Sequence, residues 1–265
     1  MTVTMPPTSQ TMAQTWQALF ALYEAIPLGW TVVGGQLVHV LCAERGVAPS
    51  RDTIDADTVV DIRADKTILA RFTQHLLDLG FHSAGVSAEE HEHRWCRDEQ
   101  QIDVLIATGL GRSRQVLGAT GSTTVPTRGG QQALDRTQPV ELNVNGILGT
   151  IPRPDLLGAL VIKAAAITTG DPQRHVDDFL MLCTLIRTAD RVGQAGRRDR
   201  HHLTHAIQAA HQRLPFTQVP NAATGLATLE EALRPAAPTP HSNTPPGSWT
   251  SKTTASAPCS ARLLP

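Results

Sequence analysis

In the first third of the chain, the spacing of apolar residues alternates between patterns typical of helices and patterns typical of strands. They recur at helical spacing over 15–26 and 65–79, which predicts two amphipathic helices. The apolar run 30–33 and the β-branched stretch 53–62 predict strands, and the apolar pattern over 36–45 predicts a helix between them. This segment therefore reads as helix, strand, helix, strand, helix.

The middle of the chain is richer in strand patterns. Two short apolar runs, 93–96 and 101–107, flank a polar turn, and Asn145-Gly146 predicts a hairpin between 139–144 and 147–151. The intervening segment 109–138 is rich in Gly, Ser, Thr and Arg, and we expect it to form a mobile connection over the active-site face.

Beyond Pro154 the apolar positions follow helical spacing. The helices predicted there span 155–166, 175–189, about 200–214 and 228–233. We therefore expect an α/β (α+β) fold, with a mixed-sheet core over 12–154 followed by a helical part over 155–234. Both ends, 1–11 and the Pro/Ser/Thr-rich tail 235–265, are expected to be disordered.

Composition and charge narrow the function classes only a little. The 265 residues are 41% hydrophobic, and 23 Lys and Arg balance 24 Asp and Glu, so any contact with RNA would need a local basic patch. Arg197, Arg198 and Arg200 form such a cluster, which is either a phosphate-binding surface or a solvated loop.

The four cysteines lack metal-ligand or disulfide spacing. Without a signal sequence or an 18-residue apolar run, we expect a cytoplasmic protein with no membrane partner.

Two aspartates two residues apart carry the main chemical signal. In a strand Asp55 and Asp57 share a face, and adjacent carboxylates repel unless a metal ion or a proton is shared between them. Asp103 interrupts the next predicted core strand, where an acid needs a partner or a function. The alternative is that the pair lies on the solvated face of an edge strand. Histidine groups at 91–93 and 201–205 are weaker metal candidates.

A glycine pair precedes these acids. Gly34 and Gly35 stand where the strand 30–33 passes into a predicted helix, and glycine allows a ligand to approach the backbone closely. A helix N-terminus offers unpaired N–H donors that suit phosphate. Phosphate groups beside carboxylates that favour Mg²⁺ indicate a nucleoside triphosphate as the ligand.

The ordered combination resembles the nucleotidyltransferases of the DNA polymerase β superfamily, and most of all the AbiEii branch, which includes MenA-type toxins of type IV toxin–antitoxin systems. The branch pattern of two glycines followed by R-x-S/T-x-D-x-D is matched by Gly34, Gly35, Arg51, Thr53, Asp55 and Asp57. The resemblance implies a nucleotidyltransferase core in which Asp55, Asp57 and Asp103 bind Mg²⁺, and Asp103 helps to deprotonate the acceptor hydroxyl. It assigns Gly34, Gly35, Arg51 and Thr53 to nucleotide binding, although Arg51 could equally be an exposed loop residue.

A second part of the pattern lies in the helical region. The branch has K-x-x-A followed by K/R-x-x-D, which is matched by Lys163 with Ala166 and by Arg174 with Asp177. The resemblance implies that Lys163 contacts the triphosphate and that Asp177 or the adjacent Asp178 belongs to the site. The alternative for both acids is the first turn of a helix, where the dipole favours negative charge.

Nucleotidyl transfer from an NTP to a hydroxyl is the activity that the resemblance implies. For a toxin-type member the acceptor is the tRNA 3′ end, and a cognate antitoxin is a partner. Two alternatives remain open at this stage. One is a small-molecule nucleotidyltransferase acting on an aminoglycoside or a lincosamide, and the other is a catalytically silent nucleotide-binding module.

Overall fold

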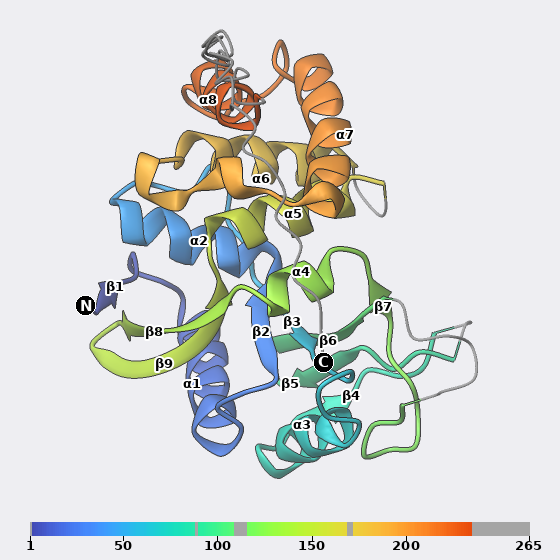
Figure 1. The fold of residues 1–265 in the computed structure, drawn as a ribbon. Coiled ribbons are helices and arrows are strands. Elements are labelled where there is room, and N and C mark those ends of the chain that lie inside the picture. Colours follow the sequence, from blue (N-terminus) through green and yellow to red (C-terminus); the bar gives the residue numbers. More distant parts are fainter. Residues whose placement is uncertain (1, 88–89, 109–115, 169–171, 235–265) are drawn as a thin grey trace, which may run out of the picture. The chain divides into compact units, whose positions relative to one another are not determined.

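The central sheet is mixed and has the strand order β2-β3-β6-β5-β4, with β7 paired to the end of β6 (Figure 1). The strands are β2 Trp30–Val33, β3 Ala56–Val60, β4 His82–Ser83, β5 Arg94–Arg97, β6 Gln100–Ala107 and β7 Pro126–Thr127. Strand β3 runs antiparallel to β2 and parallel to β6. The computed structural model describes residues 2–87, 90–108, 116–168 and 172–234.

Helix α3, Ile68–Asp78, lies in the connection that follows β3 and packs its apolar face into the core beside the sheet. Its Phe72 ring meets the Trp30 ring of β2 edge to face, with 5.2 Å between centroids. Helix α1, Gln10–Ala25, contributes Trp16 and Leu19 to the same core. The helical spacing in the sequence therefore predicted these buried faces correctly.

A second, three-stranded sheet has the order β1-β8-β9, with β1 Val3–Thr4, β8 Thr137–Val144 and β9 Ile147–Pro154. The hairpin predicted at Asn145-Gly146 joins β8 and β9, and both turn residues have positive φ. Segment 1–11 was expected to be disordered, but Val3–Thr4 pairs in parallel with β8 and Met5 is buried. The edge of the hairpin supplies these hydrogen-bond partners, which a Pro- and Thr-rich composition does not reveal.

The helical part shares its core with α2, Gly34–Arg45. It consists of α5 Leu156–Ala166, α6 Pro172–Thr184, α7 Arg197–Arg213 and α8 Ala222–Leu233. Leu37 and Leu41 of α2 belong to the same apolar cluster as Leu160 of α5 and Phe179 of α6. Residues 1–234 accordingly form one compact unit. A mixed α/β fold with a helical part, as predicted, is confirmed.

The segment 109–138 holds structure that its composition did not predict. It contains β7 and a short helix, α4 Gly130–Leu134, while residues 109–115 lie outside the described part. Gly129 has φ +75°, and a Cβ there would lie 3.0 Å from the Ile162 Cα. Glycine thus lets this segment pack directly against α5.

Two further predictions concern the end of α6 and the C-terminal tail. Helix α6 ends at Thr184, five residues before the predicted end, and short 3₁₀ turns follow it. The tail 235–265, expected to be disordered, lies outside the described residues. Across the described ranges, no helix combines the length and the apolar character needed to cross a membrane.

Candidate active site

A row of register partners crosses the central sheet where the candidate acids lie. Val33 of β2 is opposite Asp57 of β3, Asp57 is opposite Asp103 of β6, and Asp103 is opposite Arg94 of β5. Register partners on neighbouring strands point their side chains to the same face of a sheet. The structure therefore brings Asp57 and Asp103 side by side, and Asp55, which precedes β3 directly, adjoins them.

The glycine pair is fitted closely to these residues. Gly34 has φ +67°, and a Cβ at this position would lie 1.7 Å from the Asp57 Oδ2 atom. A Cβ on Gly35 would lie 2.7 Å from the Thr53 Oγ1 atom. Among the described residues, no side chain caps the start of α2 at Val33, so its first-turn N–H donors have no capping side chain there. Only glycine permits this approach of a helix N-terminus to Asp57.

Asp55 and Asp57 have opposite electrostatic settings. Burial would raise the pKa of Asp55, but a 2.7 Å hydrogen bond from Thr53 and the charge of Arg174, 3.6 Å away, hold it below its usual range. Burial and the negative charge of Asp55 raise the pKa of Asp57 to about 6; Lys163 opposes this shift and Asp103 adds to it. Burial and two neighbouring acids thus disfavour the ionised form of Asp57, and a bound cation would relieve this.

Asp103 is held by a partner that the sequence did not suggest. Arg94 donates from Nε and Nη2 to its two carboxylate oxygens, at 3.1 and 3.0 Å. The Asp103 side chain is nearly buried, whereas that of Arg94 is 45% exposed. Within the described ranges, no three Asp, Glu, His or Cys side chains stand close enough to hold a metal ion as they are arranged. The antiparallel hairpin of β5 and β6 brings Arg94 opposite Asp103. The signal that could have found this partner was the polar turn between the predicted strands 93–96 and 101–107.

Lys163, Asp178 and Arg51 form an ion triad in which Lys163 and Asp178 are buried and Arg51 is partly exposed. The Lys163 Nζ atom donates to Asp178 Oδ2 at 2.6 Å, and Arg51 binds both oxygens of Asp178 at 2.9 and 2.8 Å. Burial alone would raise the pKa of Asp178, but the two cations hold it below its usual range. The structure thus joins three of the residues that the sequence pattern selected.

Asp177 does not belong to this group. Its carboxylate accepts two hydrogen bonds from Arg213, at 3.0 and 2.8 Å, and one from Thr217 at 2.7 Å. Consecutive helical residues point about 100° apart, so only one of the two adjacent acids can face Lys163. Of the two acids that the sequence left as alternatives, the structure brings Asp178 to the site and leaves Asp177 tying α6 to the end of α7.

The two neighbouring aspartates make a matched pair of stability tests. Asp178→Asn is expected to lower the free energy of unfolding by about 3–5 kcal/mol, because it leaves a buried lysine without its counter-ion. Asp177→Asn, whose ion pair is partly solvated, is expected to cost about 1 kcal/mol. Urea unfolding near neutral pH measures both. Equal losses of unfolding free energy in the two variants would contradict the conclusion that Asp178, and not Asp177, neutralises the buried lysine.

A pocket of about 480 Å³ opens beside the acids. Gly34, Asp57 and Lys163 line one part of it, and Leu105, Val125, Ile162, Ala165 and Ala166 give it an apolar wall. Thr108, Thr127, Arg128 and His175 add polar groups. Sequence reasoning missed these four; Thr127 and Arg128 come from a segment with only loop-like composition. A pocket of this volume suits a ligand of nucleotide size.

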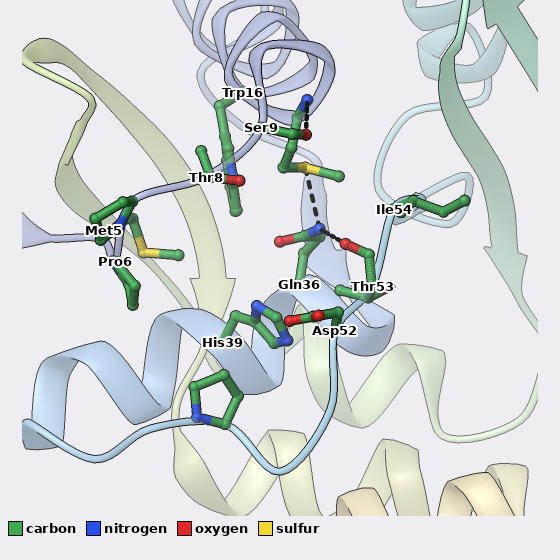
Figure 2. A pocket seen from close by; sticks show the side chains of 13 residues that line it. Met5, Pro6, Thr8, Ser9, Trp16, Gln36, His39, Asp52, Thr53 and Ile54 are labelled. Atoms are coloured by element: carbon green, nitrogen blue, oxygen red, sulfur yellow. Dashed lines mark hydrogen bonds between the residues drawn. The ribbon is translucent and has the colours of Figure 1, made fainter.

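A second pocket, of about 330 Å³, lies on the other side of the Thr53 loop, between that loop and the N-terminal segment (Figure 2). Gln36 crosses it, with its amide nitrogen 3.1 Å from both the Met12 sulfur and the Thr53 carbonyl oxygen. His39 bonds the Arg51 carbonyl at 2.8 Å, and burial lowers its pKa. Helix α2 therefore positions Arg51 and Thr53 through their backbone.

Comparison with protein-family models and with curated proteins gives no match. Among solved structures, the chain is similar to the solution structure of the antibiotic-resistance factor ANT(2'')-Ia. The two share 10% sequence identity over 78% of this chain and 97% of that chain, with a TM-score of 0.41. A likeness at this level leaves the function to be argued from the residues of the site itself.

Proposed function

We propose that this protein is a Mg²⁺-dependent nucleotidyltransferase that moves a nucleotidyl group from an NTP to an acceptor hydroxyl and releases pyrophosphate. The observation that carries the proposal is the close approach of Gly34 to Asp57, which leaves no space for a Cβ between them. It places the N–H donors of a helix N-terminus next to a carboxylate whose register partner is a second acid. Anion-binding and cation-binding groups side by side suit a metal-bound triphosphate.

The residues around the pocket divide the work of binding the nucleotide. The first-turn N–H groups at Gly34 and Gly35 and the ammonium of Lys163 face the phosphates, while the apolar wall at Ile162 accommodates the sugar and base. Asp178, which is itself bound by Arg51, holds Lys163 in place, and Thr53 holds Asp55 through its hydroxyl. The charged groups are therefore oriented before the ligand arrives.

The donor set fits Mg²⁺ bound together with a nucleotide. Mg²⁺ is usually held by one or two carboxylates, and water and substrate phosphates complete its octahedron, so Asp55 and Asp57 suffice as protein ligands. When bound, the ion would neutralise charge on the phosphates and on the attacking and leaving oxygens. We assign Asp103 as a third ligand that also draws the proton from the acceptor hydroxyl. This role requires the exposed Arg94 to release it.

For the acceptor we propose the 3′ end of tRNA, as in toxin-type members of the branch that the sequence resembles, with a cognate antitoxin as a partner. The experiment that tests the reaction supplies each of the four labelled NTPs with Mg²⁺ to a tRNA pool and to a panel of aminoglycosides and lincosamides. Label on tRNA supports the proposal, and label on the small molecules moves the protein to the small-molecule alternative.

In this assay, Asp78→Asn is the control for substitutions of the proposed catalytic aspartates, because the Asp78 side chain is exposed at the end of α3. It should transfer label as the unaltered protein does. Transfer by none of the four NTPs to either acceptor class, with binding of NTP intact, would overturn nucleotidyl transfer to these acceptors and favour the silent module.

A further inference from the structure

A cationic surface lies where the start of α7 meets α4. We call it the α7 surface, and it consists of Arg128, Gln132, Arg197, Arg198, His201 and His202. All but Arg128 line one shallow pocket of about 380 Å³. It is distinct from the pocket beside the acids, and none of its residues has a part in the site described above except Arg128.

The arginines of this surface are not neutralised within the described part of the chain. Arg197 and Arg198 are exposed and make no ion pair there, and the same holds for Arg128. The acid of that turn, Asp199, is buried and is bound by Arg136 at 2.7 Å. Arg200 differs, because its guanidinium donates to three backbone carbonyls. Positive charge is therefore concentrated on one face of the α7 N-terminal turn.

Arg128 connects this surface to the nucleotide pocket. Its side chain lines that pocket together with Asp57 and Lys163. Burial, the neighbouring His201 and the charge of Arg128 are among the causes that lower the pKa of His202, whereas Asp199 opposes them. Arg128 is thus close enough to act on α7. A ligand that carries several negative charges can follow these groups from α7 into the pocket.

The histidines add recognition of a different kind. The His201 ring lies edge to face with those of His202 and His205, at 5.6 Å between centroids in each pair. Imidazole rings contribute hydrogen bonds and flat faces, while the arginines contribute the charge. Flat rings beside guanidinium groups are the usual means of holding bases and phosphates of an RNA strand.

We infer that the α7 surface binds the phosphodiester backbone of an RNA acceptor and leads its 3′ end into the pocket beside Asp57. The inference rests on the proposed nucleotidyl transfer and adds the residues that recognise the acceptor. Arginine guanidinium groups bind phosphate oxygens in a fork geometry, which suits a backbone of regularly spaced phosphates. A cationic small molecule such as an aminoglycoside would be repelled by the same charges.

The test measures RNA binding directly, in the absence of NTP and Mg²⁺. The probe is a fluorescein-labelled RNA hairpin with a single-stranded 3′ CCA end, followed by anisotropy between about 50 and 200 mM salt. Arg197→Ser with Arg198→Ser is expected to weaken binding at least about tenfold at the low-salt end. The slope of log K against log salt should fall by roughly 1.4, since each lost contact with single-stranded RNA accounts for about 0.7.

The control variant removes the same charge elsewhere. Lys66→Ser with Arg71→Ser alters two exposed cations at the start of α3, and RNA binding should stay within about twofold. Equal weakening in both double variants would show binding by overall charge and overturn the inference. So would unchanged binding in the α7 variant, or tighter binding of a DNA hairpin of the same sequence.

Failure of this inference and failure of the proposed function can be told apart. If Asp57→Asn binds the hairpin normally but the unaltered protein transfers no nucleotide, the function fails and the α7 surface stands. If nucleotide is transferred to small molecules while RNA does not bind, the surface fails and nucleotidyl transfer stands. Matching melting temperatures for the two double variants confirm that both are folded.

Discussion

Asp57→Asn is expected to lower nucleotidyl transfer by on the order of 10³-fold or more while leaving the protein folded. The carboxylate is one of the three proposed Mg²⁺ ligands, and it lies against Gly34 at the start of α2. A bound metal supplies several kcal/mol of transition-state stabilisation, and each 1.36 kcal/mol is a factor of ten in rate. Single-turnover transfer of label measures the loss. Asparagine keeps the size of the side chain, so the packing against Gly34 should persist.

The same variant is expected to be more stable than the unaltered protein above about pH 6 when no metal is added. The pKa of Asp57 is raised to about 6 in the folded state, against about 3.9 for an unfolded chain. Between these values the folded state binds more protons, so the free energy of unfolding falls as pH rises through the window. Asparagine removes that loss, which amounts to about 1–3 kcal/mol at pH 7.

Urea unfolding at about pH 4 and above pH 7 checks this expectation. The variant should match the unaltered protein at the lower pH and exceed it at the higher one, because burial and the repulsion from Asp55 and Asp103 disfavour only the ionised carboxylate. Asp78→Asn should show no such difference. Nucleotidyl transfer that survives in Asp57→Asn would refute the proposed metal ligand, whatever the stability.

Gly34→Ala is expected to cause the second large loss. The new Cβ would lie 1.7 Å from the Asp57 Oδ2 atom, so the carboxylate must move, and the backbone must keep φ +67° with a side chain present. A displacement of about 1 Å at a reacting group costs around 10²-fold in rate. We therefore expect transfer to fall at least 10²-fold, with a stability loss above the 1–2 kcal/mol of the left-handed backbone alone.

Gly46→Ala provides the matched control for this variant. Gly46 has nearly the same backbone, with φ +68°, at the other end of α2, but a Cβ there meets nothing within 4 Å. It should lose about 1–2 kcal/mol of stability and keep its transfer rate. If the two alanine variants transferred nucleotide equally well, the close approach of Gly34 to Asp57 would have no part in the reaction.

Local patterns predicted much of the fold. Strand β2 coincides with the predicted 30–33, α2 lies within two residues of its prediction, and the hairpin turns at Asn145-Gly146. These features depend on residues close in the sequence, where side-chain periodicity and positive φ decide the conformation. Strand β1 and helix α4 escaped prediction because their partners are distant: β1 pairs with β8, and α4 packs beside α5.

The candidate site also has features that the sequence predicted and features that only the tertiary structure determined. The order of Gly34, Gly35, Asp55 and Asp57 is a property of the sequence, because a strand, a tight turn and a helix N-terminus are specified locally. Tertiary structure alone decided that Asp178 and not Asp177 meets Lys163, and that Arg128 joins the pocket to α7. Helix packing sets the two ion pairs, which join residues 15 and 36 positions apart in the sequence, and charged residues carry no local mark of the partner they will meet.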